Sequence, residues 1–481
     1  LQGAARDTKA RDMAGAPAVG TRSAAEHVAS SGEVGSAPGR LTRRRLMHAG
    51  GGATLLVGTS LAAACGAQAG PSGSQPAGGA TVPRQDVTLE WLAGANAVEE
   101  QIFRQIATAY EAANAPHKVT FINGNGGGVD WQTKLETMAA GGTPPDVAWH
   151  GPEWFPGIVS KGIYQPLDAR LSKAAKADVG DFFPRVMEQY QWEGKQYGIP
   201  ASITVMVLFY NKDLFDREGV GYPDASWTYE GKFLDAARRL TKREGDRTIQ
   251  YGVGNPHRDW VWPWAGGADY LDKAGKKVVL NAGPEAARWF QFAGDLRTKH
   301  RVAPSVAEQR AMQGGTRQFF LIGQVAMDTE GNWTLSDRKP VKEFVWDVAP
   351  IPMGSKARPT PFFSTADLVC AGSKHPDEAF AFSLHVADPE AEKVLAAEFG
   401  RVPARKSLWS YFTSLDNGLP PKNRRVIVDA LEYAGTAPRF RDFREFDSRI
   451  LAPQMTLLNE GTITAQQMIQ DLVPKLEALV Q

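Results

Sequence analysis

The hydrophobic pattern at the start of the foldable region predicts three strands separated by two helices. Residues 87–92 alternate like a half-buried strand, and residues 98–113 then carry apolar side chains at helical spacing. A second strand is expected at 118–122, a helix at 131–140 and a third strand at 146–149. This β-α-β-α-β order predicts a parallel, doubly wound sheet.

The remaining pattern continues to mix strands and helices, and the segment after Phe399 is predicted to be mainly helical. Asp388 followed by Pro389 is typical of a helix start, with the aspartate as N-cap. Strands are expected at 205–210, 251–253, 324–327, 344–348 and 367–370, and helices at 212–218, 227–240, 284–298, 377–386 and 389–399.

The length of 481 residues exceeds one typical hydrophobic core, so two lobes or domains are expected. With 43% apolar and 22% charged residues, the composition is that of an ordinary soluble globular protein. Residues 1–65 carry eight Lys/Arg and four Asp/Glu, so their removal would lower the formal net charge from +1 to about −3. That balance gives no electrostatic case for nucleic-acid binding.

The N-terminal region resembles a bacterial export signal that ends in a lipid-accepting cysteine. Arg43 and Arg44 open a basic run typical of twin-arginine signals, and a short, glycine-diluted apolar run follows. That run is too short for a spanning helix, which needs about 20 apolar residues. The run ends in Leu61-Ala62-Ala63-Ala64-Cys65, which resembles a lipoprotein processing box, although Ala62 stands three residues before Cys65. An ordinary cleaved signal is the alternative.

Composition also predicts how the signal connects to the folded part. Residues 1–41 are polar and carry no functional signal, while residues 66–85 are rich in Gly, Ser, Pro and Ala. We expect residues 66–85 to form a flexible tether between a lipid anchor and a folded body that starts near residue 86. Once Cys65 is acylated, only Cys370 remains, and its apolar neighbours predict a small buried side chain.

Compact enzymatic and cofactor motifs are missing from the sequence. The chain contains no His-Glu-x-x-His, Cys-x-x-Cys, Gly-x-Ser-x-Gly or Walker-type segment, and its eight histidines show no metal-ligand spacing. No cofactor or metal is therefore expected. The glycine-rich run at 124–129 is interpreted as a turn, with phosphate binding as the minor alternative. Glu153, Glu330 and Asp367 could form a glycosidase pair if two of them lay within about 5–10 Å.

Tryptophans beside glycine, proline or polar residues are the most informative side chains. A sugar packs a C–H face on an aromatic ring and offers hydroxyls to Asp, Glu, Asn or Arg. The segments 149–153 and 330–333 each provide both kinds of group at one loop. The alternative for any single tryptophan is a place in the core. The set comprises Trp149, Trp154, Trp260, Trp262, Trp264 and Trp333.

The order of short motifs from Val87 to Val480 resembles the extracellular solute-binding proteins of sugar ABC transporters, the maltose-binding-like class. Each motif is weak alone, and their order and spacing carry the resemblance. The sharpest are 194–200, ending in Tyr-Gly-Ile-Pro, and 208–215, which contains Phe-Tyr-Asn-Lys-Asp. Others lie at 142–147, 162–168, 226–228, 320–327, 349–352, 374–379 and 400–403.

The resemblance implies two doubly wound α/β lobes joined by three chain crossings, as in type II periplasmic binding proteins. The crossings are expected near 203–208, 361–366 and 400–404. They would divide the chain into lobe I, residues 86–203 and 364–402, and lobe II, residues 204–363 and 403–481. A ligand would bind between the lobes and close them by hinge motion. The residues expected at this site are Asn96, Asn123, Trp149, Glu153, Trp260, Trp262, Glu330, Trp333, Ser364, Asp367 and Arg401.

Together these observations predict a membrane-tethered, monomeric receptor without enzymatic activity. It would capture a carbohydrate outside the cytoplasmic membrane and deliver it to a permease with a separate ATPase chain. One alternative is a receptor of the same fold for another solute, such as a glycerophosphodiester or a peptide. A second is a secreted carbohydrate-active enzyme.

Overall fold

A computed structural model of the chain describes residues 86–125, 130–174, 178–312, 315–415 and 420–480. All of these belong to one structural unit. The predicted export signal with Arg43 and Arg44, the predicted lipidation site Cys65 and the predicted tether lie outside the described residues. No helix in the described ranges is both long and apolar enough to cross a membrane.

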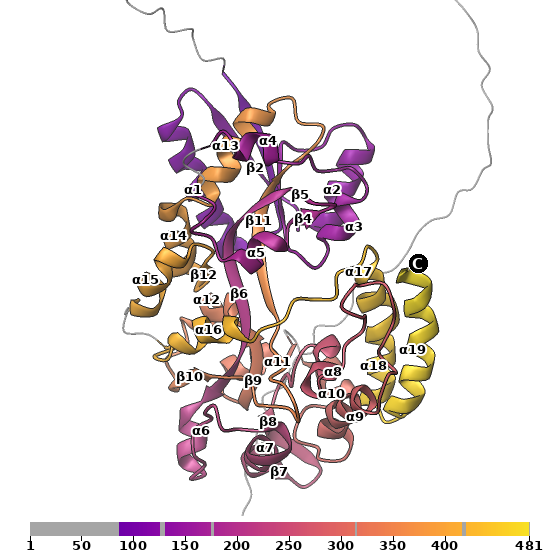
Figure 1. Ribbon diagram of the computed structural model, residues 1–481. Helices are drawn as coiled ribbons and strands as arrows, with labels where there is room; N and C mark the ends of the chain where they lie inside the picture. Colours follow the sequence, from indigo (N-terminus) through magenta and orange to yellow (C-terminus); the bar gives the residue numbers. More distant parts are fainter. Residues whose placement is uncertain (1–85, 126–129, 175–177, 313–314, 416–419, 481) are drawn as a thin grey trace, which may run out of the picture. The chain divides into compact units, whose positions relative to one another are not determined.

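The strands form one mixed sheet and a small hairpin (Figure 1). The order in the sheet is β2-β1-β3-β11-β6-β9-β8-β7, and β10 and β12 also pair with β6. The strands are β1 (Thr88–Ala93), β2 (Lys118–Asn123), β3 (Val147–His150), β4 (Gln191–Trp192), β5 (Lys195–Gln196), β6 (Gly198–Asn211), β7 (Lys242–Glu244), β8 (Arg247–Val253), β9 (Val325–Gly331), β10 (Trp346–Ala349), β11 (Phe362–Val369) and β12 (Val402–Pro403).

Helices precede or follow the strands along the whole described chain. They are α1 (Ala97–Ala113), α2 (Trp131–Ala140), α3 (Phe155–Val159), α4 (Asp168–Leu171), α5 (Pro184–Glu188), α6 (Lys212–Arg217), α7 (Leu234–Leu240), α8 (Trp262–Ala265), α9 (Glu285–Thr298), α10 (Val306–Ala311), α11 (Gly315–Leu321), α12 (Leu335–Arg338), α13 (Pro376–Val386), α14 (Pro389–Phe399), α15 (Trp409–Ser414), α16 (Arg425–Asp429), α17 (Phe443–Glu445), α18 (Ala452–Asn459) and α19 (Ala465–Val480). Short π or 3-10 turns are η2 (Tyr229–Phe233), η3 (Asp259–Val261), η4 (Asn332–Thr334), η5 (Lys406–Leu408), η6 (Ala430–Glu432) and η7 (Phe446–Leu451).

The predicted β-α-β-α-β order at the start of the folded part is confirmed. β1 pairs in parallel with β2 on one side and with β3 on the other. Helix α1 begins with a capping box, in which Asn96 accepts from the Glu99 amide and Glu99 accepts from the Asn96 amide. Asp130 caps α2 by accepting from the Gln132 and Thr133 amides, and Asp388 caps α14, as predicted, by accepting from the Ala391 amide. These caps fix the residue at which each helix begins.

A long central strand holds the distant parts of the chain together. β6 has 14 residues, all buried, and it pairs antiparallel with β9, β10, β11 and β12. The segments predicted to cross between lobes are therefore neighbours, because Phe362 faces Val205 and Val402 faces Ile203. The sheet is consequently parallel only near β1 to β3 and between β8 and β9, and antiparallel at its centre.

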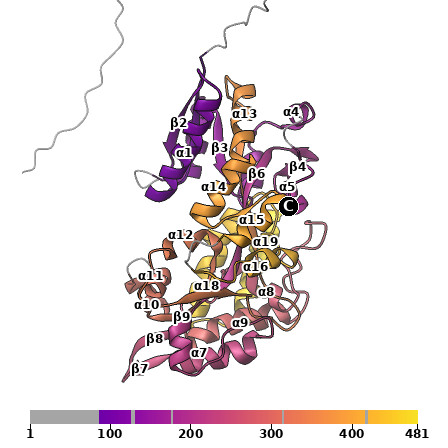
Figure 2. The ribbon, with the colours of Figure 1, turned by 90° about the vertical axis from the view of Figure 1, so that its left-hand side faces the viewer.

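Helices α1, α13 and α14 lie beside the first strands of the sheet (Figure 2). Aromatic residues form the core at this place. The Trp91 ring lies 5.2 Å from Phe103, 5.3 Å from Phe121 and 5.0 Å from Phe382 between ring centroids. A second core lies among α7, α9, α18 and α19, and a smaller third core includes Trp131. Cys370 is fully buried, as predicted, and its thiol pKa is raised by that burial.

One predicted helix is replaced by two pieces. The pattern at 227–240 predicts a continuous helix, whereas the chain forms the π-helical turn η2 followed by α7. Gly231 causes the difference, because its backbone lies outside the helical region at φ −104° and ψ −116°. A single glycine thus changes the helix type without moving its end, which remains at Leu240.

Candidate functional site

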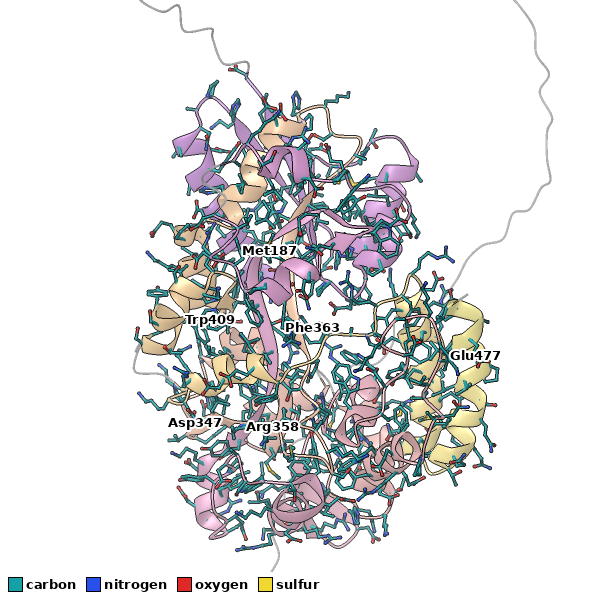
Figure 3. The ribbon with its side chains drawn as sticks, in the orientation of Figure 1. Met187, Asp347, Arg358, Phe363, Trp409 and Glu477 are labelled. Carbon is teal, nitrogen blue, oxygen red and sulfur yellow. The ribbon has the colours of Figure 1, made fainter. Side chains whose placement is uncertain are left out.

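A cavity of about 260 Å³ lies where the loops after β1, β2 and β3 approach β6 and β11. Open α/β sheets bind ligands at the carboxyl ends of their strands, and Gly94 and Gly151 directly follow β1 and β3. Phe363, labelled in Figure 3, enters the lining from β11. The lining consists of Gly94, Glu99, Asn125, Trp131, Trp149, Gly151, Glu153, Trp154, Thr204, Arg258, Trp333, Phe363, Ser364, Thr365 and Arg401.

Three tryptophans form one aromatic wall of this cavity. The Trp131 ring meets Trp149 edge-on at 5.2 Å between centroids and lies 6.2 Å from Trp154. Glycines make room for Trp131, because a Cβ at Gly124 would lie 2.3 Å from the Trp131 Cβ. A Cβ at Gly94 would lie 2.6 Å from the Trp131 Cδ1. The loops after β1 and β2 therefore shape this wall.

A second aromatic surface in the lining carries a cation. The Trp333 and Phe363 rings meet edge-on at 5.7 Å, and the Arg258 guanidinium lies 5.7 Å and 5.6 Å from their respective centroids. Those distances are within the range of cation–π attraction. A Cβ at Gly331 would lie 1.8 Å from the Trp333 ring, so this ring position requires glycine.

An ion pair closes another side of the cavity. The buried Arg401 donates from Nη2 to Glu99 Oε1 at 3.0 Å, while Glu99 Oε2 accepts from the Asn96 amide. Glu99 therefore caps α1 and holds Arg401 at the same time. Both groups have their charge compensated without any ligand.

Glu153, unlike Glu99, has no ion pair, because no described cation lies within ion-pair distance of its carboxylate. Its Oε2 atom is buried without a hydrogen-bond partner among the described residues, and so is the Trp149 indole Nε1. Burial raises the pKa of Glu153, and the charge of Arg258 opposes that rise. Buried polar atoms nearly always have partners. Among the residues that line this cavity, one acceptor, Glu153 Oε2, and two donors, Trp149 Nε1 and Arg401 Nε, therefore await a ligand or water.

Five of the predicted site residues line this cavity, and they come from four separate segments. Ser364 is held there because its hydroxyl donates to Gln189 Oε1. The structure shows that these five residues cluster around one cavity. That they contact a ligand stays a prediction. They are Trp149, Glu153, Trp333, Ser364 and Arg401.

Two predicted asparagines lie outside the lining, and their side chains bind neighbouring backbone groups and, for Asn123, the Glu100 carboxylate. Asn96 is the N-cap of α1. Asn123 donates from Nδ2 to the Ala95 carbonyl at 3.0 Å and to Glu100 Oε2 at 2.8 Å. Both residues follow strands as expected, but they shape loops beside the cavity.

Two predicted tryptophans of the later segment pack in the second core and lie outside the cavity lining. Trp260 meets Trp264 at 5.2 Å and Phe443 at 5.9 Å, and only 3% of its surface is exposed. Trp262 meets Tyr229 at 5.2 Å.

The remaining two predicted residues are carboxylates with other partners. Glu330 lies 3.7 Å from the Arg317 guanidinium. Asp367 accepts from Trp91 Nε1 at 2.6 Å, and burial raises its pKa to about 7. Neither lines the cavity with Glu153, so the carboxylates considered as a glycosidase pair are not gathered around it. The described residues also contain no cluster of three or more His, Cys, Asp or Glu suited to a metal ion.

Several lining residues were not predicted, chiefly Glu99, Trp131, Arg258 and Phe363. Trp131 carries a signal in the sequence, because it follows the capping Asp130 at the first helical position after a glycine-rich turn. Glu99 is also recognisable as the N3 residue of a capping box. Arg258 and Phe363 reach the cavity only through tertiary packing.

Comparison with known proteins gives consistent matches to binding proteins. The diacetylchitobiose binding protein DasA of Streptomyces coelicolor is 25% identical over 381 residues, which cover 76% of this chain and 84% of DasA. The ABC substrate-binding protein Lmo0181 of Listeria monocytogenes, solved with cycloalternan, superposes with a TM-score of 0.74 at 24% identity, covering 82% of this chain and 99% of Lmo0181. UgpB of Mycobacterium tuberculosis, solved with glycerophosphocholine, gives a TM-score of 0.70 at 18% identity, covering 82% and 98% of the two chains.

These structural likenesses establish the fold, which is that of the type II periplasmic binding proteins. The sequence profile of the bacterial extracellular solute-binding proteins matches residues 94–393, more than half of the chain. That match includes β3, the loop after it and η4, which supply Trp149, Glu153 and Trp333 respectively. The chain therefore belongs to the bacterial extracellular solute-binding protein family.

Proposed function

We propose that this protein is the extracytoplasmic receptor of an ABC importer and that its ligand is a carbohydrate. The observation that carries the proposal is the cavity lined by Trp131, Trp149, Trp154 and Trp333 together with the unpartnered carboxylate of Glu153. Aromatic rings pack on the C–H faces of a sugar, and a carboxylate accepts two of its hydroxyls. The names of DasA and of the Lmo0181 complex, which both concern carbohydrates, support this ligand class.

Delivery to a membrane permease follows from the family and from the proposed export. The receptor works as a monomer on the outer face of the cytoplasmic membrane, held there by a lipid on Cys65. A separate ATPase chain drives transport. Mass measurement of the mature N-terminus tests the anchor, since an unmodified Cys65 would contradict it.

The two-lobe division proposed from the sequence is supported by the pairing of the three crossing segments. β11 and β12 both pair with β6 at Ser202 and Ile203. The cavity lies beside this junction, because Thr204, Ser364 and Thr365 line it. We propose that hinge motion at these strands closes lobe I and lobe II on the ligand.

Binding without turnover is the proposed chemistry. A glycosidase needs two carboxyl groups on either side of the scissile bond. Of the two glutamates in the lining, Glu99 is held by Arg401, which leaves Glu153 alone. Release of sugar products by the purified protein, abolished in Glu153→Ala, would overturn the proposal of a receptor.

One observation favours a second candidate, a glycerophosphodiester with a quaternary ammonium group. Trp131, Trp149 and Trp154 stand beside the unpaired Glu153, and aromatic rings with a nearby carboxylate attract such cations. Arg258 could pair with the phosphate. UgpB, solved with glycerophosphocholine, shares the fold.

Thermal unfolding in the presence of a ligand panel distinguishes the two candidates. The panel contains glucose, maltose, maltotriose, N-acetylglucosamine, diacetylchitobiose and glycerophosphocholine. A ligand at a hundredfold excess over its Kd stabilises the folded state by about 2.7 kcal/mol, so Tm should rise with at least one sugar. A rise with glycerophosphocholine and with no sugar would transfer the assignment to the second candidate.

A further inference from the structure

The side chain of Asn332 lies where the segments proposed to cross between the lobes come together. Asn332 is the first residue of η4, directly after β9, and it is fully buried and outside the lining of the candidate cavity. We propose that Asn332 is a positioning residue of the receptor, which holds the crossing segments together and thereby sets ligand affinity without touching the ligand. This inference rests on the proposed function as a two-lobed receptor.

The Asn332 side chain fills a gap between two strands on one edge of β6. β11 pairs with β6 along one edge as far as Val205, so β9 and β12 occupy the other edge. On that edge β9 ends opposite Met206 and β12 lies opposite Ile203, which leaves Val205 between them. The Val205 amide donates to Asn332 Oδ1 at 2.6 Å. Because a buried backbone N–H without an acceptor is costly, Asn332 completes the ladder at the first crossing.

The other end of the same side chain holds the third crossing. Asn332 Nδ2 donates to the Gly400 carbonyl at 2.6 Å. Gly400 ends α14 in the left-handed region at φ +69°, and a Cβ there would lie 2.4 Å from Leu335 Cδ1 on α12. Gly400 is therefore held both by its own backbone conformation and by close packing on the helix that follows η4. One amide group thus joins β6 to the segment that carries Arg401.

The next residue connects η4 to the second crossing and to the candidate cavity. Trp333 lines the cavity, and its ring meets Phe363 of β11 edge-on at 5.7 Å. Asn332 and Trp333 together therefore contact all three crossing segments. A ligand that packs on Trp333 acts on the same short turn that holds Val205 and Gly400, so ligand contact and the position of the crossings are coupled.

A buried ion pair fixes η4 to the strand that precedes it. Arg338 of α12 donates from Nη2 to Asp328 of β9 at 2.8 Å, and both side chains are fully buried. The turn is therefore held between β9 and α12, which belong to the proposed lobe II. Gly400 belongs to the proposed lobe I, so the hydrogen bond from Asn332 to Gly400 links the two lobes.

Hydrogen exchange of the ligand-free full chain tests this role without any sugar. Asn332→Ala removes both hydrogen bonds and should speed amide exchange about tenfold in all three crossing segments, 203–208, 361–366 and 400–404. Asn211→Ala is the matched control, because Asn211 is also a buried asparagine and its Oδ1 accepts from the Leu214 amide at the far end of β6. This control should leave exchange in the crossing segments unchanged. Faster exchange confined to the Val205 amide would overturn the proposal.

Calorimetric titration then measures the effect on ligand affinity, with maltose, maltotriose and diacetylchitobiose as probes. Asn332 lies outside the cavity lining, so its loss should act by lowering the fraction of chains that are competent to bind. Asn332→Ala should therefore weaken every probe that wild-type protein binds by the same factor, about fivefold. Asn211→Ala should bind these probes as wild type does, even where urea unfolding shows an equal loss of stability. That difference separates positioning from a purely structural role.

A second variant covers the case in which Asn332→Ala fails to fold. Asn332→Ser has a shorter side chain with one hydroxyl, which cannot keep both hydrogen bonds, and it should show the same pattern. Wild-type affinity in a folded Asn332 variant, or equal losses of affinity in the Asn332 and Asn211 variants, would overturn the positioning role. Absence of binding of every sugar by wild-type protein would instead contradict the proposed carbohydrate ligand, and hydrogen exchange alone would then decide the role of Asn332.

Discussion

Arg401 donates to Glu99 at 3.0 Å and thereby ties the residue before β12 to the first turn of α1. Arg401 is 5% exposed, and 22% of the Glu99 side chain is exposed. Only one member of this ion pair is predicted from the sequence, because Arg401 is expected at the site and Glu99 is not.

Replacing Arg401 by methionine should therefore destabilise the protein and weaken ligand binding together. Loss of the partner leaves Glu99 partly buried and unpaired, which we expect to lower the free energy of unfolding by about 1–2 kcal/mol after allowance for solvent. Urea unfolding measures this change. Arg425→Met is the matched control, since its pair with Asp429 is exposed and should cost less than about 0.5 kcal/mol. Equal effects of both variants would contradict a structural role for the buried pair.

Trp149 and Trp260 should separate binding from folding. Trp149 lines the cavity with an unpartnered indole nitrogen, so Trp149→Ala should weaken sugar affinity by about 2 kcal/mol. Trp260 is core-packed, so Trp260→Ala should lower unfolding free energy by about 3–5 kcal/mol. Titration and urea unfolding of both variants measure the two quantities. An intact sugar affinity in Trp149→Ala would remove this residue from the site.

Asp367 should make stability fall as pH rises from about 4 to about 7. Its folded-state pKa, about 7, is raised above an ordinary value of 3.8, so the folded protein binds a proton that the unfolded chain releases. The contribution of Asp367 to the free energy of unfolding is therefore fully present below pH 4 and is lost as the pH rises through 7. Asp367→Asn keeps an acceptor for Trp91 and should flatten that part of the profile. Unfolding measured from pH 4.5 to 8 checks this, and parallel profiles for both proteins would contradict it.

The sequence predicts the fold well where local signals are complete. Residues 131–140 are predicted as a helix with both ends correct, because Asp130 and Gly141 mark them. The central strand is predicted only from 205 to 210, although it begins at Gly198. Its polar residues find partners far along the chain, as when Ser202 and Thr365 share a hydrogen bond of 2.7 Å. Such partners cannot be seen in a local pattern.

The candidate site was predictable only in part for the same reason. A tryptophan beside glycine or a polar residue is equally suited to a cavity wall or to a core. Trp333 faces the cavity, whereas Trp260 packs on Phe363 and Phe443, which come from distant segments. Arg258 is likewise positioned by Trp333 and Phe363. Whether each of these side chains lines the cavity or packs in the core depends on ring packing between segments that are far apart in the sequence.

The contact between Arg444 and Asp130 gives the last prediction, which concerns closure. Arg444 on α17 donates to the N-cap of α2 at 3.0 Å, and so joins the proposed lobe II to the proposed lobe I. Both side chains are more than 40% exposed, so Arg444→Ala should change unfolding free energy by less than about 1 kcal/mol. If the contact stabilises the closed form, the dissociation rate of a bound sugar should rise several-fold.

Stopped-flow measurement of sugar release tests this expectation with a closely matched control. Arg441 pairs with its neighbour Asp442 at 3.2 Å within one segment, so Arg441→Ala leaves the link between α17 and α2 intact. Release should therefore be faster in Arg444→Ala and unchanged in Arg441→Ala. If both variants release sugar at the wild-type rate, closure does not depend on this ion pair and must rest on the contacts that the ligand itself makes with the two lobes.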